Sequence, residues 1–315
     1  MCFKAYYRAC AANTKEQSVF HGIIMNISEL IKRASLRLAD TSDSPSLDAE
    51  LLLGMVLRKS RTQLYAYGDS SVAIEDEALF SELIEKRLKH VPIAHITGIR
   101  DFWTLTLKVS PDTLVPRPET EILVEEALTR ISQDTVTRVL DLGSGSGAVI
   151  LAIGSERPHA ELHATDLSTE ALEVAEENGA CCEQMVHWYQ GDWFAALNNP
   201  RAPDGDARKP LFDIIVSNPP YISIEETGLT DPELEFEPYI ALYSGDDGLD
   251  AIRTILSSAI NYLDADGWLL LEHGLGQAAA IRQLFAKHGF IQISTVLDLA
   301  GLPRITSGCR PQAAD

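Results

Sequence analysis

Four consecutive residues, Asn218-Pro219-Pro220-Tyr221, follow the apolar segment 212–216 and are suited to methylating a planar NH₂ group. Such a nitrogen is a poor nucleophile because its lone pair is delocalised, so a catalyst must orient its N–H groups. The Asn218 side-chain oxygen can accept one N–H and the Pro219 carbonyl the other, while the proline rings hold the backbone rigid. Tyr221 can pack on the target. The four candidate catalytic residues therefore predict methyl transfer driven by positioning and electrostatics.

The glycine-rich segment 141–147 stands where an expected strand meets an expected helix. Open α/β sheets bind ligands at the carboxyl ends of strands, and glycines let a ligand approach the main chain. The spacing differs from the G-x-G-x-x-G pattern of dinucleotide sites, and the carboxylate of Asp141 suits a ligand that carries an ammonium group and a sulfonium. The segment therefore favours S-adenosylmethionine over NAD. Its candidate cofactor-binding residues are Asp141, Gly143, Ser144, Gly145, Ser146 and Gly147.

Two further strand ends are expected to contact the same cofactor. Asp166 ends the second strand, where a carboxylate can accept hydrogen bonds from both ribose hydroxyls. Asp166 could instead cap the following helix, although Ser168 can do so. After the third strand, Asp192 offers an acceptor and Trp193 an apolar face for an adenine, although Trp193 could also be a core aromatic. These candidate contacts are Asp166, Leu167, Asp192 and Trp193.

The elements that must position these residues alternate between strands and helices from residue 138 onward. Such alternation predicts a mostly parallel sheet with helices on both faces. We expect strands at 139–142, 161–165, 186–189, 212–216 and 268–272, and helices at 148–156, 169–178, 249–263 and 277–288. Strands at 290–297 and 305–309 lack a long helix between them, so they are expected to form a hairpin that puts an antiparallel strand in the sheet.

The N-terminal region reads as helical from residue 26 to about 90. Apolar residues recur at helical spacing from Ile27 to Leu38, Ser46 can cap a second helix, and a third is expected over 75–89. One-sided apolar helices must bury that side, so we expect a small bundle. Residues 105–109 then alternate as in a half-buried strand. Residues 1–24 lie outside these patterns, and 199–209 have the composition of a surface loop.

Composition narrows the class of protein. The 315 residues carry a formal charge of −20, and 45% of them are hydrophobic. The length suggests two domains, and the acidic surface disfavours direct contact with nucleic acid. Five cysteines without a C-x-x-C spacing predict neither a disulfide framework nor a metal site, and suit the cytoplasm. No segment approaches the roughly 18 apolar residues needed to span a membrane.

These motifs together resemble the release factor glutamine methyltransferases, the HemK/PrmC family, over about residues 25–310. Asn-Pro-Pro-Tyr alone is shared with DNA adenine methyltransferases, whereas the segment Pro116-Arg117-Pro118-Glu119-Thr120-Glu121 is more specific to this family. The other matching pieces are 92–98, Asp101-Phe102-Trp103, the glycine loop, Phe236-Glu237-Pro238 and Leu271-Glu272-His273-Gly274. Glu235 stands where family members often carry Arg, which leaves open how this face meets its partner.

The resemblance implies a class I S-adenosylmethionine-dependent methyltransferase, Rossmann-like, with a small N-terminal helical bundle. It implies methylation of the glutamine side-chain amide in the GGQ loop of peptide chain release factors, and so a role in translation termination. The implied organisation is 1–24 extension, 25–92 release-factor docking, 93–117 linker hairpin and 118–315 catalytic domain. Asn218 would also be a cofactor-binding residue. Phe102, Arg117 and Glu119 would wall the pocket between domains, although Arg117 and Glu119 could simply pair at a helix start. We expect a monomer.

Three other functions compete with this interpretation. A DNA or RNA adenine N6-methyltransferase would use the same four residues on a flipped base, but should carry a basic groove. A non-enzymatic binding module should have lost the glycine loop, Asp166 or Asn218, all of which are present. An NAD-dependent oxidoreductase is disfavoured by the glycine spacing.

Overall fold

The computed structural model describes residues 25–198, 210–227 and 231–312. The predicted N-terminal extension 1–24 and the predicted surface loop 199–209 lie outside these described residues. The chain divides into two compact units between Thr97 and Gly98, and each unit is described here by itself.

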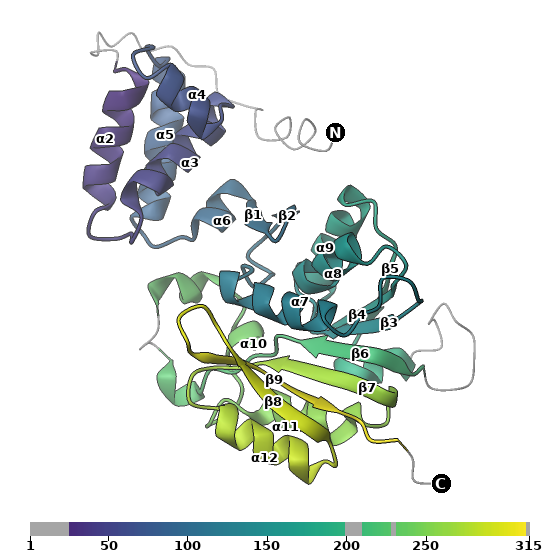
Figure 1. The fold of residues 1–315 in the computed structure, drawn as a ribbon. Coiled ribbons are helices and arrows are strands. Elements are labelled where there is room, and N and C mark those ends of the chain that lie inside the picture. Colours follow the sequence, from purple (N-terminus) through teal and green to yellow (C-terminus); the bar gives the residue numbers. More distant parts are fainter. Residues whose placement is uncertain (1–24, 199–209, 228–230, 313–315) are drawn as a thin grey trace. The chain divides into compact units, whose positions relative to one another are not determined.

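The N-terminal unit is a small helical bundle, as predicted. Its helices are α2 (Ile27–Leu38), α3 (Pro45–Leu57), α4 (Arg61–Ala66), α5 (Ile74–Arg87) and α6 (Ile93–Thr97) (Figure 1). A reciprocal capping box starts α2, in which the Asn26 side chain accepts from the Glu29 N–H at 2.8 Å and the Glu29 carboxylate accepts from the Asn26 N–H at 3.1 Å. The bundle encloses its own apolar core.

One detail of this unit was predicted wrongly and one was missed. Helix α3 begins at Pro45, with Ser44 as its N-cap residue, so Ser46 lies inside the helix and does not cap it. Proline suits the first helical position because the N–H that it lacks would have no helical partner there. The short helix α4 was not predicted, although Ser60 and Gln63 form a capping box at its start.

The larger unit contains a seven-stranded sheet in the order β5-β4-β3-β6-β7-β9-β8. Its strands are β3 (Arg138–Leu142), β4 (Glu161–Asp166), β5 (Val186–Gln190), β6 (Phe212–Ser217), β7 (Leu263–Glu272), β8 (Ile291–Leu297) and β9 (Pro303–Cys309). The predicted closing hairpin is confirmed, because β9 pairs antiparallel with both β7 and β8. The α/β class and the antiparallel strand are therefore as predicted. A separate pair, β1 (Ile99–Phe102) and β2 (Leu105–Lys108), precedes the sheet.

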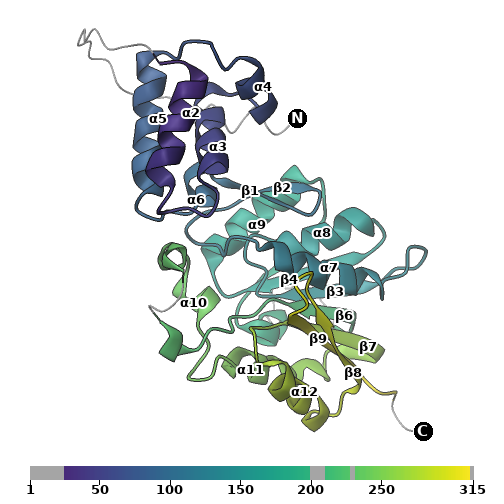
Figure 2. The same cartoon turned by 60° about the vertical axis from the view of Figure 1, so that its left-hand side comes forward.

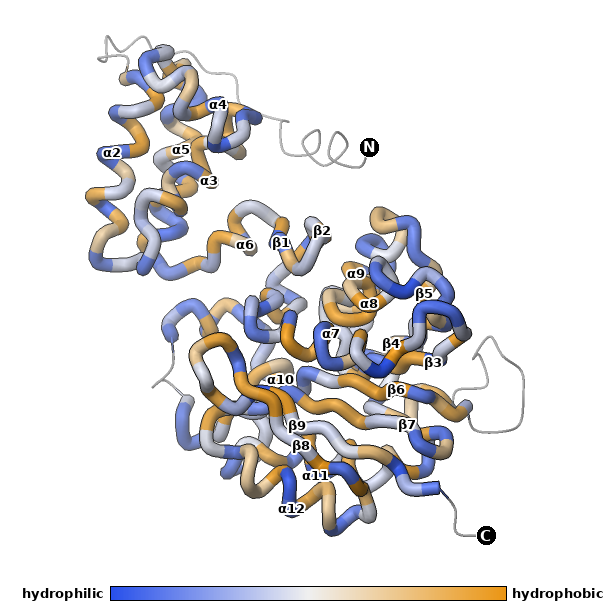
Figure 3. Tube along the Cα trace, in the orientation of Figure 1, coloured by the Kyte–Doolittle hydropathy of each residue, from blue (hydrophilic) through white to orange (hydrophobic). Residues whose placement is uncertain are grey.

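Helices cover both faces of this sheet (Figure 2). One face carries α7 (Glu121–Leu128), α8 (Ala148–Glu156) and α9 (Thr169–Cys181), and the other carries α11 (Asp250–Ala259) and α12 (Ala278–Lys287). Central strands β6 and β7 are largely apolar (Figure 3), as burial on both faces requires. No helix of the described ranges is long and apolar enough to cross a membrane.

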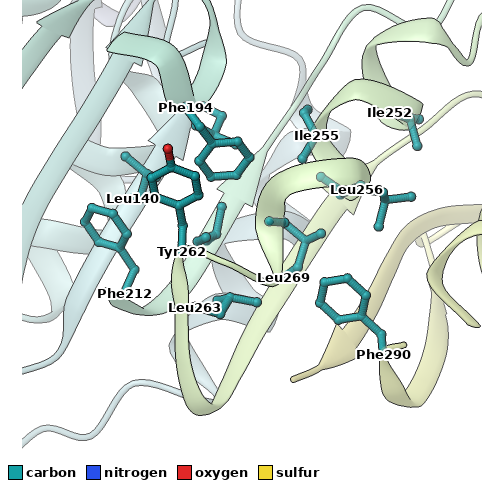
Figure 4. Packing of buried hydrophobic residues seen from close by; sticks show 14 of the residues in the cluster. Leu140, Phe194, Phe212, Ile252, Ile255, Leu256, Tyr262, Leu263, Leu269 and Phe290 are labelled. Carbon is teal, nitrogen blue, oxygen red and sulfur yellow. The ribbon is translucent and has the colours of Figure 1, made fainter. Parts of the chain in front are cut away.

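Each face has its own hydrophobic cluster. The cluster under α11 and α12 includes Phe194 and Tyr262, whose rings stack with centroids 4.5 Å apart (Figure 4). The cluster under α7 and α8 includes Leu123 and Ile150. The two clusters hold the sheet between the helical layers, so the strand ends keep fixed positions relative to one another.

Strand register brings the carboxyl ends of β3, β6 and β7 to the same end of the sheet. Asp141 of β3 is aligned with Val216 of β6, and Ser217 of β6 with Leu271 of β7. The Ser217 hydroxyl also donates to the Leu142 carbonyl at 2.6 Å. The residues that follow these strands, the glycine loop and the Asn-Pro-Pro-Tyr segment among them, therefore emerge side by side.

Candidate functional site

A cavity of about 640 Å³ lies at the carboxyl ends of the parallel strands in the larger unit. Its size is typical of small-molecule sites, which usually enclose about 300–1,000 Å³. Gly143, Gly145, Asp166, Trp193 and Asn218 line it. Five residues that were predicted to bind one cofactor from four separate strand ends thus share one cavity.

The glycine loop takes a conformation that glycine favours. Backbone φ is +72° at Gly143, +54° at Gly145 and +81° at Gly147. The N–H groups of Gly143 and Ser144 both donate to the Thr165 carbonyl, at 2.8 and 3.0 Å. A side chain added at Gly145 would meet no atom within 4 Å, so Gly145 leaves its main chain open to a ligand.

Asp166 connects the loop to the neighbouring strand end. One carboxylate oxygen accepts from the Gly145 N–H at 2.7 Å, and the other accepts from the Ser168 N–H at 2.9 Å. Burial raises the pKa of Asp166. The cap of α9 is Ser168, whose hydroxyl accepts from the Ala171 N–H at 3.0 Å. Asp166 is therefore free of that capping role, and it lines the cavity.

Asp141, at the start of the glycine loop, does not line the cavity. Its side chain is 2% exposed, and Oδ2 has no hydrogen-bond partner among the described residues. Burial, with a smaller effect of the Asp166 charge, raises the pKa of Asp141 to about 7. Ser144 and Ser146 are also buried, and Gly147 is the N-cap of α8. Direct cofactor contact by these four residues stays a prediction.

The remaining predicted cofactor contacts lie along the larger cavity. Leu167, Asp192 and Trp193 all line it, and the first two are exposed. Trp193 is partly buried and also packs against the hydrophobic cluster under α11 and α12. The two readings of Trp193, an adenine platform and a core aromatic, are thus both compatible with its position. Its ring also lies 3.3 Å from where a Gly143 side chain would be.

A second cavity, of about 180 Å³, adjoins the first. Leu114, Asn218 and Ala241 line both. Successive residues of the Asn-Pro-Pro-Tyr segment alternate between them, because Pro219 and Tyr221 line the smaller cavity and Pro220 the larger one. The four candidate catalytic residues therefore form the boundary between two cavities of different size.

Asn218 presents an unused hydrogen-bond acceptor at this boundary. Its side-chain nitrogen donates to the Thr120 hydroxyl at 3.2 Å. Its side-chain oxygen is buried and has no partner among the described residues. A buried acceptor without a hydrogen-bond partner costs free energy. Such an atom therefore indicates that a bound ligand donates the missing hydrogen bond.

The main chain of Tyr221 is held by Gln277, whose side-chain nitrogen donates to the Tyr221 carbonyl at 2.9 Å. Burial and the nearby Glu272 charge raise the pKa of Tyr221, so the phenol stays protonated. Burial likewise raises the pKa of Glu272 to about 7. Tyr221 thus lines the smaller cavity with a neutral phenol.

The three residues expected to wall the pocket are dispersed. Arg117 lines the smaller cavity and forms an ion pair with the buried Glu237, not with Glu119. The helix-start pair considered as an alternative is therefore wrong. Glu119 is exposed, and Phe102 is 2% exposed within the hydrophobic cluster under α7 and α8, because its apolar ring packs there rather than facing a cavity.

Several residues of the site were missed from the sequence. Leu114, Thr120, Glu237 and Glu272 all belong to segments whose motifs had been noticed, so the signal was present but their roles were not. Other lining residues come from α10 (Tyr239–Leu242), α11 and the segment between them, for which the sequence offered no chemical pattern. They are Ile240, Ala241, Tyr243, Ser244, Asp250, Ala251 and Thr254.

Another group of titratable side chains lies at the amino ends of β4 and β5. Ligand atoms of Glu161, His163 and His187 are within 4.8 Å of one another. Both ring nitrogens of His163 are already hydrogen-bonded, to Tyr189 and to Glu161 at 3.0 Å each, and Arg138 pairs with Glu161 at 3.3 Å. Burial lowers the pKa of His163. This cluster is accounted for by bonds within the protein.

Two family models match the chain. The PrmC N-terminal domain matches residues 29–98, and the methyltransferase small domain matches residues 118–230. The first match covers the helical unit, and the second covers the glycine loop and the Asn-Pro-Pro-Tyr segment.

Curated relatives match almost end to end. The release factor glutamine methyltransferase of Coxiella burnetii is 45% identical over 90% of this chain and 98% of its own length. That of Escherichia coli K12 is 40% identical over 88% of this chain and 96% of its own length. Among solved structures, the hMettl16 catalytic domain in complex with MAT2A 3'UTR hairpin 6 has a TM-score of 0.54, with 12% identity over 73% of this chain and 84% of that chain. At this identity the likeness concerns the fold alone.

Proposed function

The chain belongs to the release factor glutamine methyltransferase family, and from that premise we propose that it methylates the glutamine of the GGQ motif in peptide chain release factors. The methyl group comes from S-adenosylmethionine, and the acceptor is the side-chain amide nitrogen. The observation that carries this proposal is the unpartnered Asn218 oxygen at the boundary of two adjoining cavities.

The larger cavity fits S-adenosylmethionine. The open main chain at Gly145 leaves room beside the loop. Asp141, two residues before Gly143, has a buried carboxyl oxygen without a partner among the described residues, and this carboxyl favours a positively charged amino group nearby. The carboxylate of Asp166 has lone pairs left for ribose hydroxyls, and Trp193 offers an apolar face for adenine. When bound, this cofactor supplies an electrophilic methyl group on a positively charged sulfur.

The smaller cavity suits a glutamine side chain. The Asn218 oxygen accepts one N–H of the glutamine amide and the Pro219 carbonyl accepts the other, which turns the nitrogen lone pair toward the larger cavity. Tyr221 packs on the planar amide, and Arg117 lines the same smaller cavity. Positioning of this kind supplies most of the catalysis, because no strong base is needed when the nitrogen releases its proton to water after methyl transfer.

The partner is a protein rather than a nucleic acid. The net charge of −20 opposes a phosphate backbone, and the helical N-terminal unit is proposed as the release-factor docking domain. Action as a monomer and a cytoplasmic location stay predictions from the sequence.

Incubation with methyl-labelled S-adenosylmethionine and an intact release factor tests the proposal. We expect one methyl group, placed by mass spectrometry on the GGQ glutamine. Adenine-containing DNA and RNA, offered in parallel, should take up no label. If the nucleic acid is labelled and the release factor is not, the substrate assignment is wrong.

A further inference from the structure

The side chain of Gln277 joins three main-chain segments, one of which is the end of the Asn-Pro-Pro-Tyr segment. Its nitrogen donates to the Tyr221 carbonyl at 2.9 Å and to the Asp247 carbonyl at 3.3 Å. Its oxygen accepts from the Gly274 N–H at 2.9 Å. Tyr221 follows β6, Asp247 precedes α11 and Gly274 follows β7, so one side chain connects places that are far apart in the sequence.

Donor and acceptor counting gives the Gln277 amide a single orientation. A glutamine amide has two hydrogens to donate and one oxygen that accepts. The main-chain carbonyls of Tyr221 and Asp247 can only accept, and the Gly274 N–H can only donate. The NH₂ group must therefore face the two carbonyls, and both of its hydrogens are used there.

Two glycines make room for this side chain. A Cβ atom at Gly248 would lie 2.2 Å from the Tyr221 carbonyl oxygen and 2.7 Å from the Gln277 side-chain nitrogen. A Cβ atom at Gly274 would lie 3.2 Å from the Gln277 side-chain oxygen and 3.2 Å from the Tyr221 ring. The approach of Gln277 to the Tyr221 main chain thus depends on the absence of side chains at both positions.

Gln277 is also the N-cap residue of α12, but its side chain makes no capping bond to that helix. Short side chains with an oxygen, those of Ser, Thr, Asp and Asn, are preferred at this position because they accept from the first helical N–H groups. The chain therefore places an amide here that holds Tyr221 and Gly274 instead of the helix end.

The segment that Gln277 holds is stiff. The rings of Pro219 and Pro220 fix φ, so a shift of the Tyr221 main chain is passed back along the segment. Its other end follows β6, where the Ser217 hydroxyl donates to the Leu142 carbonyl at 2.6 Å. Between these two points of attachment lies the Pro219 carbonyl, which the proposed function assigns to an N–H of the substrate amide.

On the basis of the proposed function, we propose that Gln277 is a positioning residue that sets the place of the Pro219 carbonyl and of Tyr221 for methyl transfer. Gln277 lines neither cavity, so it acts through the main chain of Tyr221 and does not touch the substrate or the cofactor. Its two donated hydrogen bonds hold the end of the catalytic segment against the turn before α11.

Steady-state kinetics of Gln277→Glu and Gln277→Met test this assignment. Glutamate keeps the length and the acceptor for Gly274, but it places an oxygen against the two carbonyls. Methionine keeps the length and makes none of the three bonds. We expect kcat for release-factor methylation to fall by about 10- to 100-fold in both, because a small misplacement of groups around the reacting atoms costs that much. The KM for the release factor and the dissociation constant of S-adenosylmethionine, measured by calorimetry, should change little.

Gln184→Glu is the matched control. Gln184 is also half-buried, its side-chain nitrogen donates to the Leu151 carbonyl at 3.0 Å, and it lines neither cavity. Its substitution should lower the melting temperature and leave kcat unchanged.

The inference is overturned if folded Gln277→Glu and Gln277→Met keep the wild-type kcat. It is also overturned if Gln184→Glu loses kcat to the same extent, or if the affinity for S-adenosylmethionine falls together with kcat in the Gln277 variants. Failure of the wild-type protein to label any release factor would instead remove the proposed function itself.

Discussion

Arg117 and Glu237 form an ion pair although 120 residues separate them in the chain. The second oxygen of Glu237 accepts from the Val115 N–H at 2.9 Å. Glu237 thereby joins the segment before α7, which contains Leu114, to the start of α10, which contains Ala241. Both Leu114 and Ala241 line both cavities. The Glu237 side chain is fully buried, whereas that of Arg117 is one-third exposed.

We expect Arg117→Ala to leave the Glu237 carboxylate buried without its cation. Breaking a buried pair costs about 3–5 kcal/mol, and the exposure of Arg117 reduces that figure here. The melting temperature should fall, and the KM for the release factor should rise more than the dissociation constant of S-adenosylmethionine. Lys108→Ala, which breaks an exposed pair with Glu177, is the control and should alter neither. Equal behaviour of the two variants would contradict the structural role of Arg117.

Removal of the Asn218 side chain should affect catalysis more than folding. Its oxygen has no partner in the protein, so Asn218→Ala loses only the bond to Thr120. We expect kcat to fall by at least about 100-fold, the scale of losing one positioned transition-state contact. Incorporation of labelled methyl into a release factor measures the rate, and circular dichroism checks the fold. Near-normal turnover would exclude Asn218 from the mechanism.

Gly145→Ala should weaken cofactor binding. The added methyl group would enter open space beside the loop at φ +54°, where a side chain is also strained by about 1–2 kcal/mol. Gly301→Ala is a close control, because φ is +78° and no atom lies within 4 Å of the added carbon, but Gly301 is in the turn between β8 and β9. Calorimetry with S-adenosylmethionine should show weaker binding for Gly145→Ala alone. A similar loss in both would assign the effect to backbone strain.

Burial of Asp141 predicts a pH-dependent stability. Its folded pKa of about 7 lies above the ordinary value of 3.8, so the folded protein holds this proton more tightly than the unfolded chain does. The resulting stability is fully present below the unfolded pKa and is lost as the pH rises through 7. At about 1.4 kcal/mol per pKa unit, the loss between pH 5 and 8 is on the order of 2 kcal/mol.

Asp141→Asn removes this titration. Urea unfolding of the ligand-free protein at pH 5 and pH 8 should therefore show the variant gaining stability relative to the wild type at the higher pH. Asp264→Asn alters an exposed carboxyl in β7, and its difference from the wild type should stay constant. A pH-independent difference for Asp141→Asn as well would show that the Asp141 pKa is not raised.

Local patterns in the sequence were sufficient for the fold class and the reaction chemistry. Strand and helix periodicity predicted every strand of the seven-stranded sheet, since burial on one or both faces dictates which positions are apolar. Glycine spacing in 141–147 and the side chains of 218–221 indicated a cofactor and a methyl acceptor, because those properties depend on residues adjacent in the chain. Even the two-residue error at the start of α3 came from a local choice between two serines, Ser44 and Ser46.

Contacts between distant segments were decided only by the tertiary structure. The Asn218 amide meets Thr120 98 residues away, and Arg117 meets Glu237 rather than Glu119 two positions along. Sequence spacing cannot encode such pairs, because they depend on strand order, on register and on which side chain the folded core leaves nearest. The sequence by itself thus determined which groups perform the chemistry. The packed sheet decided which way each group faces, because only there are the competing donors and acceptors brought within bonding distance.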